Sequence, residues 1–419
     1  ADWILGINAS YAMCKATGLG NNSLGRVQTP VLAAISRRYR ERENHISSDS
    51  WPIYISLQKD GILFKMRRTQ DLPDKESATM FFQDCKLAHQ AQITGISHSV
   101  KEILPPDLLD LTQLQKEANI RYGFTASEVY DIAQSLYEKK LISYPRTSSR
   151  YLTEDVFDSL PPIMACLLSW ELFPAAKGTG GIDISNLSRH VISAEKANVH
   201  HAIIITGIRP GNLSEKEMQV YRLVAGRMLE TFMAPCRIET TNVEAVCAAQ
   251  HFKAEQTRII EAGWHDVFMR YDMIPTSGYS VKELPEVEKG DTLNVCGCNM
   301  VHKKELPVDP FTDAELVEYM ELNGLGTVSS RTNIIRTLVN RKYIRYSGKY
   351  IVPTPKGMFT YETIRGKKIA DTSLTADWEK QLAGLESGMI TGQDFLNRIR
   401  TLAKEMTDDI FNTYSTKEE

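Results

Sequence analysis

The amino-acid sequence predicts a multidomain α+β protein in which β-rich regions are nested between helical ones. Its 419 residues exceed the roughly 250 that one hydrophobic core normally organises, so two to four domains are expected. Hydrophobic patterns of two kinds follow each other in the order helical, β, helical, β, helical. A 13-residue pattern also occurs twice, once from residue 132 and again from residue 334.

The first β region is marked by strict alternation of apolar residues. A helical pattern covers residues 1 to about 47 and ends in the charged run SRRYRERE. From Trp51 apolar residues alternate, and a turn at Gly61 separates two alternating runs, which is typical of a β-hairpin. The strand-like pattern is expected to continue up to Pro105 and Pro106.

The later regions repeat this change of period. A hydrophobic pattern with helical period covers residues 107 to 235. It includes TASEVYDIAQSLYEKK, where Thr125 and Glu128 are expected to form a capping box. Apolar residues alternate again over residues 236 to 305, and a mainly helical pattern follows. The order predicts nesting, with three domains: an outer helical domain (1–50 and 306–419), a β-rich strap (51–106 and 236–305) and an inner helical domain (107–235).

Composition sets limits on function. Apolar residues make up 42% and charged residues 24%, and the formal net charge of −3 does not indicate nucleic-acid binding, so any basic groove must be local. Of seven cysteines only Cys296 and Cys298 are close together, and they lack the second ligand pair of a zinc site. No apolar run approaches 18 residues, and the start ADWILGINAS is not a signal peptide.

The internal repeat suggests a nucleic-acid module. IAQSLYEKKLISY (132–144) and IIRTLVNRKYIRY (334–346) each predict a helix, a basic corner and a strand. The second continues with SGKYIVP, a hairpin, and a helix followed by a hairpin is the shape of a winged helix, which we expect near 311–353. Any helix followed by a strand gives a similar pattern, so the repeat alone leaves the function open.

LISYPRTSSRYL (141–152) holds the residues best suited to chemistry. Pro145 restricts Tyr144 to an extended conformation, in which Arg146 should share a face with the phenol. A phenol with a pKa of about 10 is a poor nucleophile at neutral pH, and a guanidinium favours phenolate and binds phosphodiester oxygens. The alternative is a tyrosine that ends a hydrophobic strand beside an incidental arginine.

This segment is one of several that carry a single resemblance. It is similar to the active-site segment of type IA DNA topoisomerases, most closely of their bacterial topoisomerase III branch. SLGRVQTPVLAAI (23–35), VHHAIIIT (199–206) and FTDAELVEYMELNGLGTVSSRTNII (311–335) resemble other segments of that family, in the same order. EAGW, KGD and TADWE add weaker agreement, and the matches run from residue 1 to about 400.

The resemblance implies roles for individual residues. Tyr144 would be the nucleophile, giving a 5′-phosphotyrosine link and a free 3′ hydroxyl; Arg146 would stabilise the transition state and His200 would position the scissile phosphate. The implied DNA-binding residues are Ser23, Arg26, Gln28, Thr147, Ser330, Arg331 and Arg341. Taken alone, His200 and His201 could be a buried pair, and Arg26 and Arg341 could be solvated helix charges.

The resemblance also implies a shape and partners. The fold would be an open toroid or arch that binds single-stranded DNA at the tyrosine and admits duplex DNA to a central hole. Hinges would lie near residues 100–107 and 232–240. The full-length protein would be a monomeric isomerase of the bacterial cytoplasm and nucleoid. It would not need ATP, and GLGTVSS lacks the lysine of a nucleotide-binding loop.

Three departures from the family pattern qualify this. The sequence begins where the family's N-terminal Toprim domain should have ended, so the Mg²⁺ ligands of the full-length enzyme are expected in that domain and none in this chain. The chain alone is therefore expected to be inactive. Ser148 stands where the family commonly has Asp, and Ile205 stands where it has Pro.

Two rival interpretations remain. The first is a non-catalytic single-stranded nucleic-acid-binding module on the same scaffold. The second is a tyrosine recombinase, which also forms phosphotyrosine links. A recombinase needs its arginine, lysine and histidine constellation before a C-terminal tyrosine, whereas Tyr144 precedes VHHAII, so the order is wrong.

Overall fold

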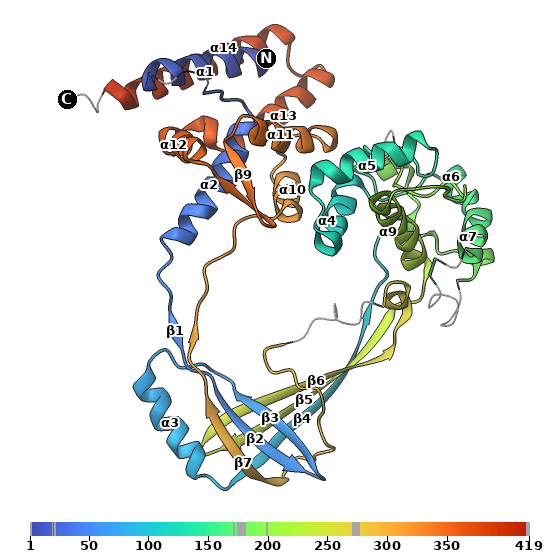
Figure 1. Cartoon of the computed structure of the whole chain (residues 1–419), viewed down its shortest axis with the longest axis vertical. Helices are drawn as coiled ribbons and strands as arrows, with labels where there is room; N and C mark the ends of the chain where they lie inside the picture. The colour runs from blue at the N-terminus through green and yellow to red at the C-terminus, as the bar shows by residue number, and fades with distance from the viewer. Residues whose placement is uncertain are drawn as a thin grey trace.

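The computed structural model describes residues 2–18, 20, 22–170, 172–173, 182–197, 200–269 and 277–415. Val199, the first residue of VHHAIIIT, lies outside them. Figure 1 shows a β-barrel at one end of the molecule and two clusters of helices at the other, connected on one side by extended segments and on the other by long strands. The mixed helical and β composition predicted from the sequence is confirmed.

Six strands form the barrel. They pair in the closed order β2-β3-β6-β5-β4-β7, and every pair is antiparallel. Their bounds are β2 Ile53–Lys59, β3 Ile62–Arg68, β4 Gln90–Ile103, β5 Cys236–Cys247, β6 Gln250–Glu261 and β7 Thr292–Met300. A short pair, β1 Asp49–Ser50 with β8 Lys303–Lys304, ties the two extended segments together. The predicted hairpin is β2–β3, whose alternating Ile53, Ile55 and Leu57 are fully buried.

One expectation for this region is wrong. The strand-like pattern was expected to run without a break to Pro105, but Lys75–Leu87 forms helix α3. Asp74 accepts a hydrogen bond from the amide of Ser77 at 2.7 Å, which caps the helix, and Ala78 and Cys85 are buried. The helix lies against the barrel (Figure 1), so burial at helical spacing, rather than alternation, organises this stretch.

The inner helical cluster is built around α9. Its helices are α4 Leu111–Tyr122, α5 Ala126–Glu138, α6 Glu154–Asp158, α7 Leu160–Ser169, α8 Ala194–Ala197 and α9 Glu215–Phe232. Most of the second half of α9 is buried, so the other elements pack around it. The capping box predicted at Thr125 and Glu128 begins α5.

The outer helical cluster combines both ends of the chain. It contains α1 Asp2–Thr17, α2 Gln28–Glu43, α10 Asp313–Leu322, α11 Val328–Asn340, β9 Ile344–Ser347, β10 Tyr350–Pro353, α12 Pro355–Ile364, α13 Ser373–Glu386 and α14 Gly392–Ser415. Helix α1 packs on α14, and α2 packs against α12 and β10. None of the described helices is long and apolar enough to cross a membrane.

The two copies of the repeat share a helix end and then diverge. Lys140 and Lys342 both adopt a left-handed conformation, with φ of 59° and 61°, where each helix stops. After Lys342 the chain forms the antiparallel hairpin β9–β10. After Lys140 the expected strand is reduced to a single bridge between Ile142 and Ile205. The turn that carries Tyr144 is therefore shaped by a distant segment rather than by a hairpin.

The inner and outer clusters are in direct contact. Helix α10 packs against α4, and α11 packs against α5. Buried polar groups cross this interface: the Gln115 side-chain amide donates to the Thr332 hydroxyl at 2.9 Å, and the Ala126 amide donates to an Asp313 carboxylate oxygen at 3.1 Å. Because buried polar groups are costly to leave unpaired, these bonds define one specific way for the clusters to meet.

Candidate active site and nucleic-acid interface

The segment that carries Tyr144 is held against the segment that carries His200. The amide of Ser143 donates to the carbonyl oxygen of Ile204 at 2.8 Å, and the Ile204 amide donates to the Ser143 hydroxyl at 3.0 Å. The buried hydroxyl of Thr147 donates to the carbonyl oxygen of His200 at 2.8 Å. These bonds bring together two residues that are far apart in the chain and fix their relative position.

Tyr144 is not a core residue. Its ring is half-buried and lies with its centroid 4.4 Å from that of the exposed His200 imidazole, at an interplanar angle of 44°. Tyr137 of α5 contacts it edge-on, with centroids 5.4 Å apart. Within the part of the chain that the structure describes, the Tyr144 hydroxyl makes no hydrogen bond. The phenol oxygen can therefore approach a ligand beside an imidazole.

The position of Arg146 differs from the sequence expectation. Its guanidinium lies over the Tyr130 ring, 5.1 Å from the centroid, and donates to the side-chain oxygen of Gln134 at 3.1 Å. Both partners belong to α5. The rule that residues two apart share a face requires a regular strand, and this segment is not one. The Nε atom of Arg146 is buried and has no partner among the described residues, so one donor is free.

Thr147 has a structural role in this arrangement. It is 3% exposed, and its hydroxyl also accepts a hydrogen bond from the Ser149 amide at 3.0 Å. Nearby, Arg150 donates to Asp110 at 2.7 Å, and Asp110 caps α4 through the amide of Gln113. The segment after Tyr144 is thus anchored to the N-terminal end of α4, and the predicted contact of Thr147 with DNA stays a prediction.

A second group of predicted residues meets in the outer cluster. One guanidinium nitrogen of Arg341 donates to the hydroxyl of Ser23 at 2.7 Å and to the side-chain oxygen of Gln28 at 2.9 Å. The Tyr343 hydroxyl accepts a hydrogen bond from the Ser23 amide at 2.6 Å. We call Ser23, Gln28 and Arg341 the Arg341 cluster. It joins the start of α2 to the end of α11.

A cation that the sequence did not indicate lies beside this cluster. The Lys356 ammonium lies 4.4 Å from the centroid of the Tyr343 ring and donates to the carbonyl oxygen of Arg341 at 3.1 Å. Burial lowers the pKa of Lys356, and the positive charges of Arg341 and Lys342 lower it further. No spacing signal links Lys356 to Arg341, because the hairpin that folds it back is needed to bring them together.

The other predicted DNA-binding residues lie elsewhere. Arg26 forms an ion pair with Asp2 at 2.7 Å and lies over the ring of Trp378, 5.0 Å from its centroid. Ser330 completes the capping box that begins α11. Arg331 is only 8% exposed and donates to the Thr112 hydroxyl at 3.0 Å. Its side chain is turned into the interface between the clusters, and its contact with a DNA backbone stays a prediction.

A metal site was not expected in this chain. Among the described residues there is no group of three or more His, Cys, Asp or Glu side chains that could hold a metal ion. The side chains around Tyr144 include an imidazole and a guanidinium, and these do not fit Mg²⁺, which prefers carboxylate oxygens together with water or phosphate. The reaction steps proposed below therefore involve only side chains of this chain.

The sequence matches a known family of proteins. A family model described as DNA topoisomerase matches residues 1–397, so the chain belongs to the DNA topoisomerase family. The resemblance to type IA topoisomerases noted in the sequence is confirmed.

Individual relatives refine the comparison. DNA topoisomerase 3 of Bacillus licheniformis is 31% identical over 435 residues, which cover 98% of this chain and 59% of that protein. DNA topoisomerase 1 of Methanocaldococcus jannaschii is 31% identical over 426 residues, covering 100% of this chain and 54% of that protein. This chain thus spans less than two thirds of the length of these relatives.

A solved structure agrees in fold. The full-length topoisomerase I of Thermotoga maritima superimposes with a TM-score of 0.73 and covers 97% of this chain and 66% of that one, at 22% sequence identity. At this identity the match supports the fold alone.

Proposed function

We propose that this chain carries the nucleophile of a type IA DNA topoisomerase, which cuts one DNA strand, passes another strand and reseals the break. The observation that carries the proposal is the contact between the Tyr144 ring and the His200 imidazole, with a phenol oxygen that no described residue engages. A core aromatic of this size normally buries its ring and pairs its hydroxyl. The Tyr144 ring is only half-buried, and no described residue pairs with its hydroxyl.

The proposed step is an in-line transfer at phosphorus. The Tyr144 oxygen attacks the scissile phosphodiester, the bond from phosphorus to the 3′ oxygen breaks, and a 5′-phosphotyrosine forms. The proton leaves the phenol, and the 3′ oxygen ends as a hydroxyl, so atoms and charge balance. Resealing reverses these changes, and no ATP is needed because the covalent link retains the energy of the broken bond.

His200 and Arg146 are proposed to assist at the phosphate. His200 is exposed beside the phenol and can donate a hydrogen bond to a nonbridging oxygen. Arg146 has an Nε donor with no partner among the described residues. Its guanidinium group must turn away from Gln134 to bind the phosphate through two hydrogen bonds. Binding of DNA is thus expected to rearrange Arg146, whereas His200 is already in position.

The same proposal assigns the parts of the molecule. The outer and inner clusters would act as the outer and tyrosine-bearing domains, and the barrel as the strap between them. Single-stranded DNA would run from the Arg341 cluster toward Tyr144, and duplex DNA would occupy the opening of an arch. The hinges would lie near residues 100–107 and 232–240, where long strands enter the inner cluster.

We further propose that cleavage needs a Toprim domain, which in full-length enzymes would supply Mg²⁺ ligands and acid–base help. General acid–base catalysis is typically worth about 10²–10⁴-fold, so the chain alone should not relax supercoiled DNA. Appreciable relaxation by the purified chain would contradict this part of the proposal.

The test adds the Toprim domain of the Bacillus licheniformis relative in trans and looks for a covalent DNA adduct on a denaturing gel. A single-stranded oligonucleotide labelled at its 3′ end should stay attached to the protein, and one labelled at its 5′ end should be released. Tyr144→Phe should abolish the adduct, whereas the matched control Tyr137→Phe should keep it.

The outcomes separate the alternatives. An adduct that survives Tyr144→Phe would overturn the assignment of the nucleophile. Salt-sensitive DNA binding with no adduct under any condition would favour the non-catalytic single-stranded module. Retention of the 5′ label instead of the 3′ label would indicate recombinase-like polarity.

A further inference from the structure

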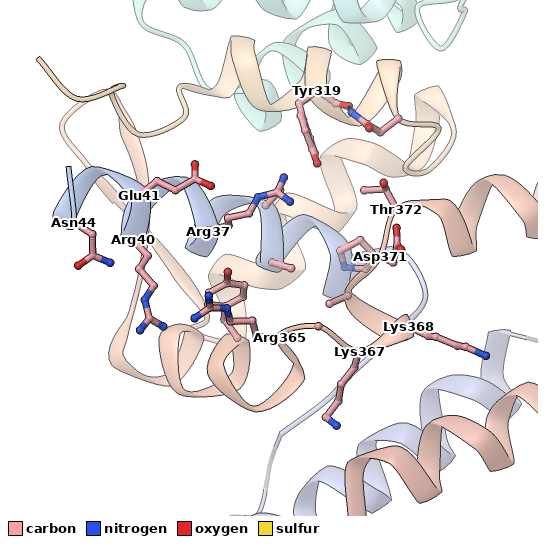
Figure 2. A pocket seen from close by; sticks show the side chains of 17 residues that line it. Arg37, Arg40, Glu41, Asn44, Tyr319, Arg365, Lys367, Lys368, Asp371 and Thr372 are labelled. Carbon is pink, nitrogen blue, oxygen red and sulfur yellow. Dashed lines mark hydrogen bonds between the residues drawn. The ribbon is translucent and has the colours of Figure 1, made fainter. Parts of the chain in front are cut away.

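A polar cavity on the outer cluster gathers charges of both signs. It has a volume of about 950 Å³ and lies between α2, α10 and the segment that follows α12 (Figure 2). Its lining includes the guanidinium groups of Arg37, Arg40 and Arg365 and also the carboxylates of Glu41 and Asp371. Because cations and anions stand together, the lining favours neither an anionic nor a cationic ligand. A more selective arrangement lies in the barrel.

Three cysteines from distant parts of the chain meet in the core of the barrel. Cys85 belongs to α3, Cys247 ends β5, and Cys298 lies on β7. Cys85 and Cys247 are buried in the same apolar cluster, at 0% and 1% exposure, and Cys298 packs against that cluster. All seven cysteines of the chain are free thiols. The barrel thus holds three neighbouring thiols, although no two of them are close in the sequence.

Helix α3 brings Cys85 to the other two cysteines. The Cys298 thiol donates a long hydrogen bond of 3.9 Å to the carbonyl oxygen of Phe82. Phe82 lies three residues before Cys85 on α3 (85 − 82 = 3), and residues three apart share one face of a helix. The Cys85 thiol interacts with the thiols of both Cys247 and Cys298. Packing of α3 against β7 therefore makes Cys85 the centre of the group.

This arrangement suits a disulfide better than a metal ion. Within the part of the chain that the structure covers, no three His, Cys, Asp or Glu side chains are placed to hold a metal ion. The three thiols therefore do not converge on one point. A disulfide needs only two neighbouring thiols, and Cys85 has two such neighbours.

The three thiols differ in access and in acidity. Cys298 is partly exposed, whereas Cys85 and Cys247 are buried. The interaction with Cys85 lowers the pKa of the Cys298 thiol. The interactions with Cys247 and Cys298 raise the pKa of Cys85, and burial adds to this. Because the thiolate is the reactive form of cysteine, an oxidant from solvent should react first at Cys298.

We propose that Cys298 and Cys85 form an oxidation site, which reacts with a hydroperoxide and closes a disulfide between β7 and α3. The Cys298 thiolate attacks one peroxide oxygen, the O–O bond breaks, and Cys298 becomes a sulfenic acid. The leaving hydroxide or alkoxide takes up the proton that Cys298 lost. The Cys85 sulfur then attacks the Cys298 sulfur, the S–O bond breaks, and the Cys85 proton leaves in water. Two thiols lose two electrons, and the peroxide gains them.

The disulfide changes how firmly the barrel is held together. It closes a loop of 213 residues (298 − 85 = 213), which contains the inner cluster. A cross-link that closes a long loop restricts the unfolded chain, so the oxidised protein should resist unfolding more than the reduced one. The inference does not rest on the proposed function, because no residue of the Tyr144 site or the Arg341 cluster takes part.

The experiment treats the folded chain with hydrogen peroxide and maps its disulfides by mass spectrometry of unreduced peptides. A peptide pair joined through Cys85 and Cys298 should appear, and dithiothreitol should remove it. The urea midpoint should rise on oxidation and return on reduction. Absence of the pair from a chain whose exposed Cys166 and Cys296 have been oxidised would overturn the proposal, because the oxidant had then acted. An unchanged midpoint in the cross-linked chain would overturn the proposed effect on the barrel.

Variants assign the order of the two steps. Cys85→Ala and Cys298→Ala should each abolish the peptide pair, whereas the matched control Cys236→Ala should keep it. Cys236 is also 0% exposed but belongs to a different apolar cluster. In Cys85→Ala the sulfenic acid should persist at Cys298 and be labelled by dimedone, and in Cys298→Ala dimedone should leave Cys85 unlabelled. Labelling of Cys85 in Cys298→Ala would reject Cys298 as the point of entry. A pair that joins Cys85 to Cys247 instead would reject the assigned partner.

Discussion

Asp313 offers a direct test of how the two helical clusters are joined. It begins α10, is 2% exposed, and accepts hydrogen bonds from the Ala126 amide of α5 and from the Tyr346 hydroxyl, each at 3.1 Å. Burial raises the pKa of Asp313 to about 6, and the nearby charge of Glu128 adds to this, while the two hydrogen bonds act in the opposite direction. The interface thus contains a carboxylate that it does not fully compensate.

The effect on stability follows from the direction of this shift. The pKa rises from an ordinary 3.8 to about 6, and a shift of about two units corresponds to about 3 kcal/mol. Because the folded pKa lies above the unfolded one, the contribution is fully present below pH 3.8 and is lost as the pH rises through about 6. Between pH 5 and pH 7.5 the loss is about 1.4 kcal/mol.

The perturbation is Asp313→Asn, which keeps an acceptor oxygen but cannot ionise. We expect its free energy of unfolding, relative to the unchanged chain, to improve by about 1.4 kcal/mol between pH 5 and pH 7.5. Urea titrations followed by tryptophan fluorescence at both pH values measure this difference. The control is Asp131→Asn, because the Asp131 side chain is 62% exposed and its substitution should give no such change.

A difference between variant and unchanged chain that stays constant from pH 5 to pH 7.5 would refute this reasoning. The same contact matters for function if the clusters must separate to pass a strand. Separation exposes the carboxylate to water, so opening should become easier at the higher pH by a similar amount. Asp313→Asn should remove that pH dependence as well.

Other changes test the remaining contacts. Thr147→Val should cost about 1–3 kcal/mol in urea unfolding and lower the adduct yield, because a buried hydrogen bond that positions the histidine segment is lost. Arg331→Met should cost about 2 kcal/mol, since it removes a buried donor, whereas the more exposed Arg336→Met should cost less than about 1 kcal/mol. Gly357→Ala should lower the melting temperature, because its Cβ would collide with a backbone carbonyl just before β9, while Gly392→Ala, with open space around it, should be neutral.

Local signals in the sequence were reliable where neighbouring residues decide the structure. The capping box at Thr125 and Glu128 and the hairpin around Gly61 each depend on groups a few residues apart, and both are present. The failure at Lys75–Leu87 has a different cause: this helix lies between two alternating stretches, and the strand pattern was extended across it. The order of helical and β regions came from long windows, in which such local errors average out.

The candidate site depended more on long-range contacts. Resemblance to a family identified Tyr144 and His200, but their 4.4 Å approach exists because the segments that carry them are hydrogen-bonded to each other. The roles of Arg146 and Arg331 stay predictions. Their hydrogen-bond partners, Gln134 and Thr112, lie on other helices, so no local pattern in the sequence indicated those contacts.

The sequence by itself determined the helical and β regions, the family and the identity of the proposed nucleophile. Hydrophobic periodicity, helix caps and motifs depend on residues that are close together in the chain, so they can be recognised without the structure. Only the tertiary structure decided which cations form ion pairs and how Lys356 comes to bind the Arg341 carbonyl. The physical reason is that charge compensation and burial depend on groups hundreds of residues apart. No local pattern records which of them will meet.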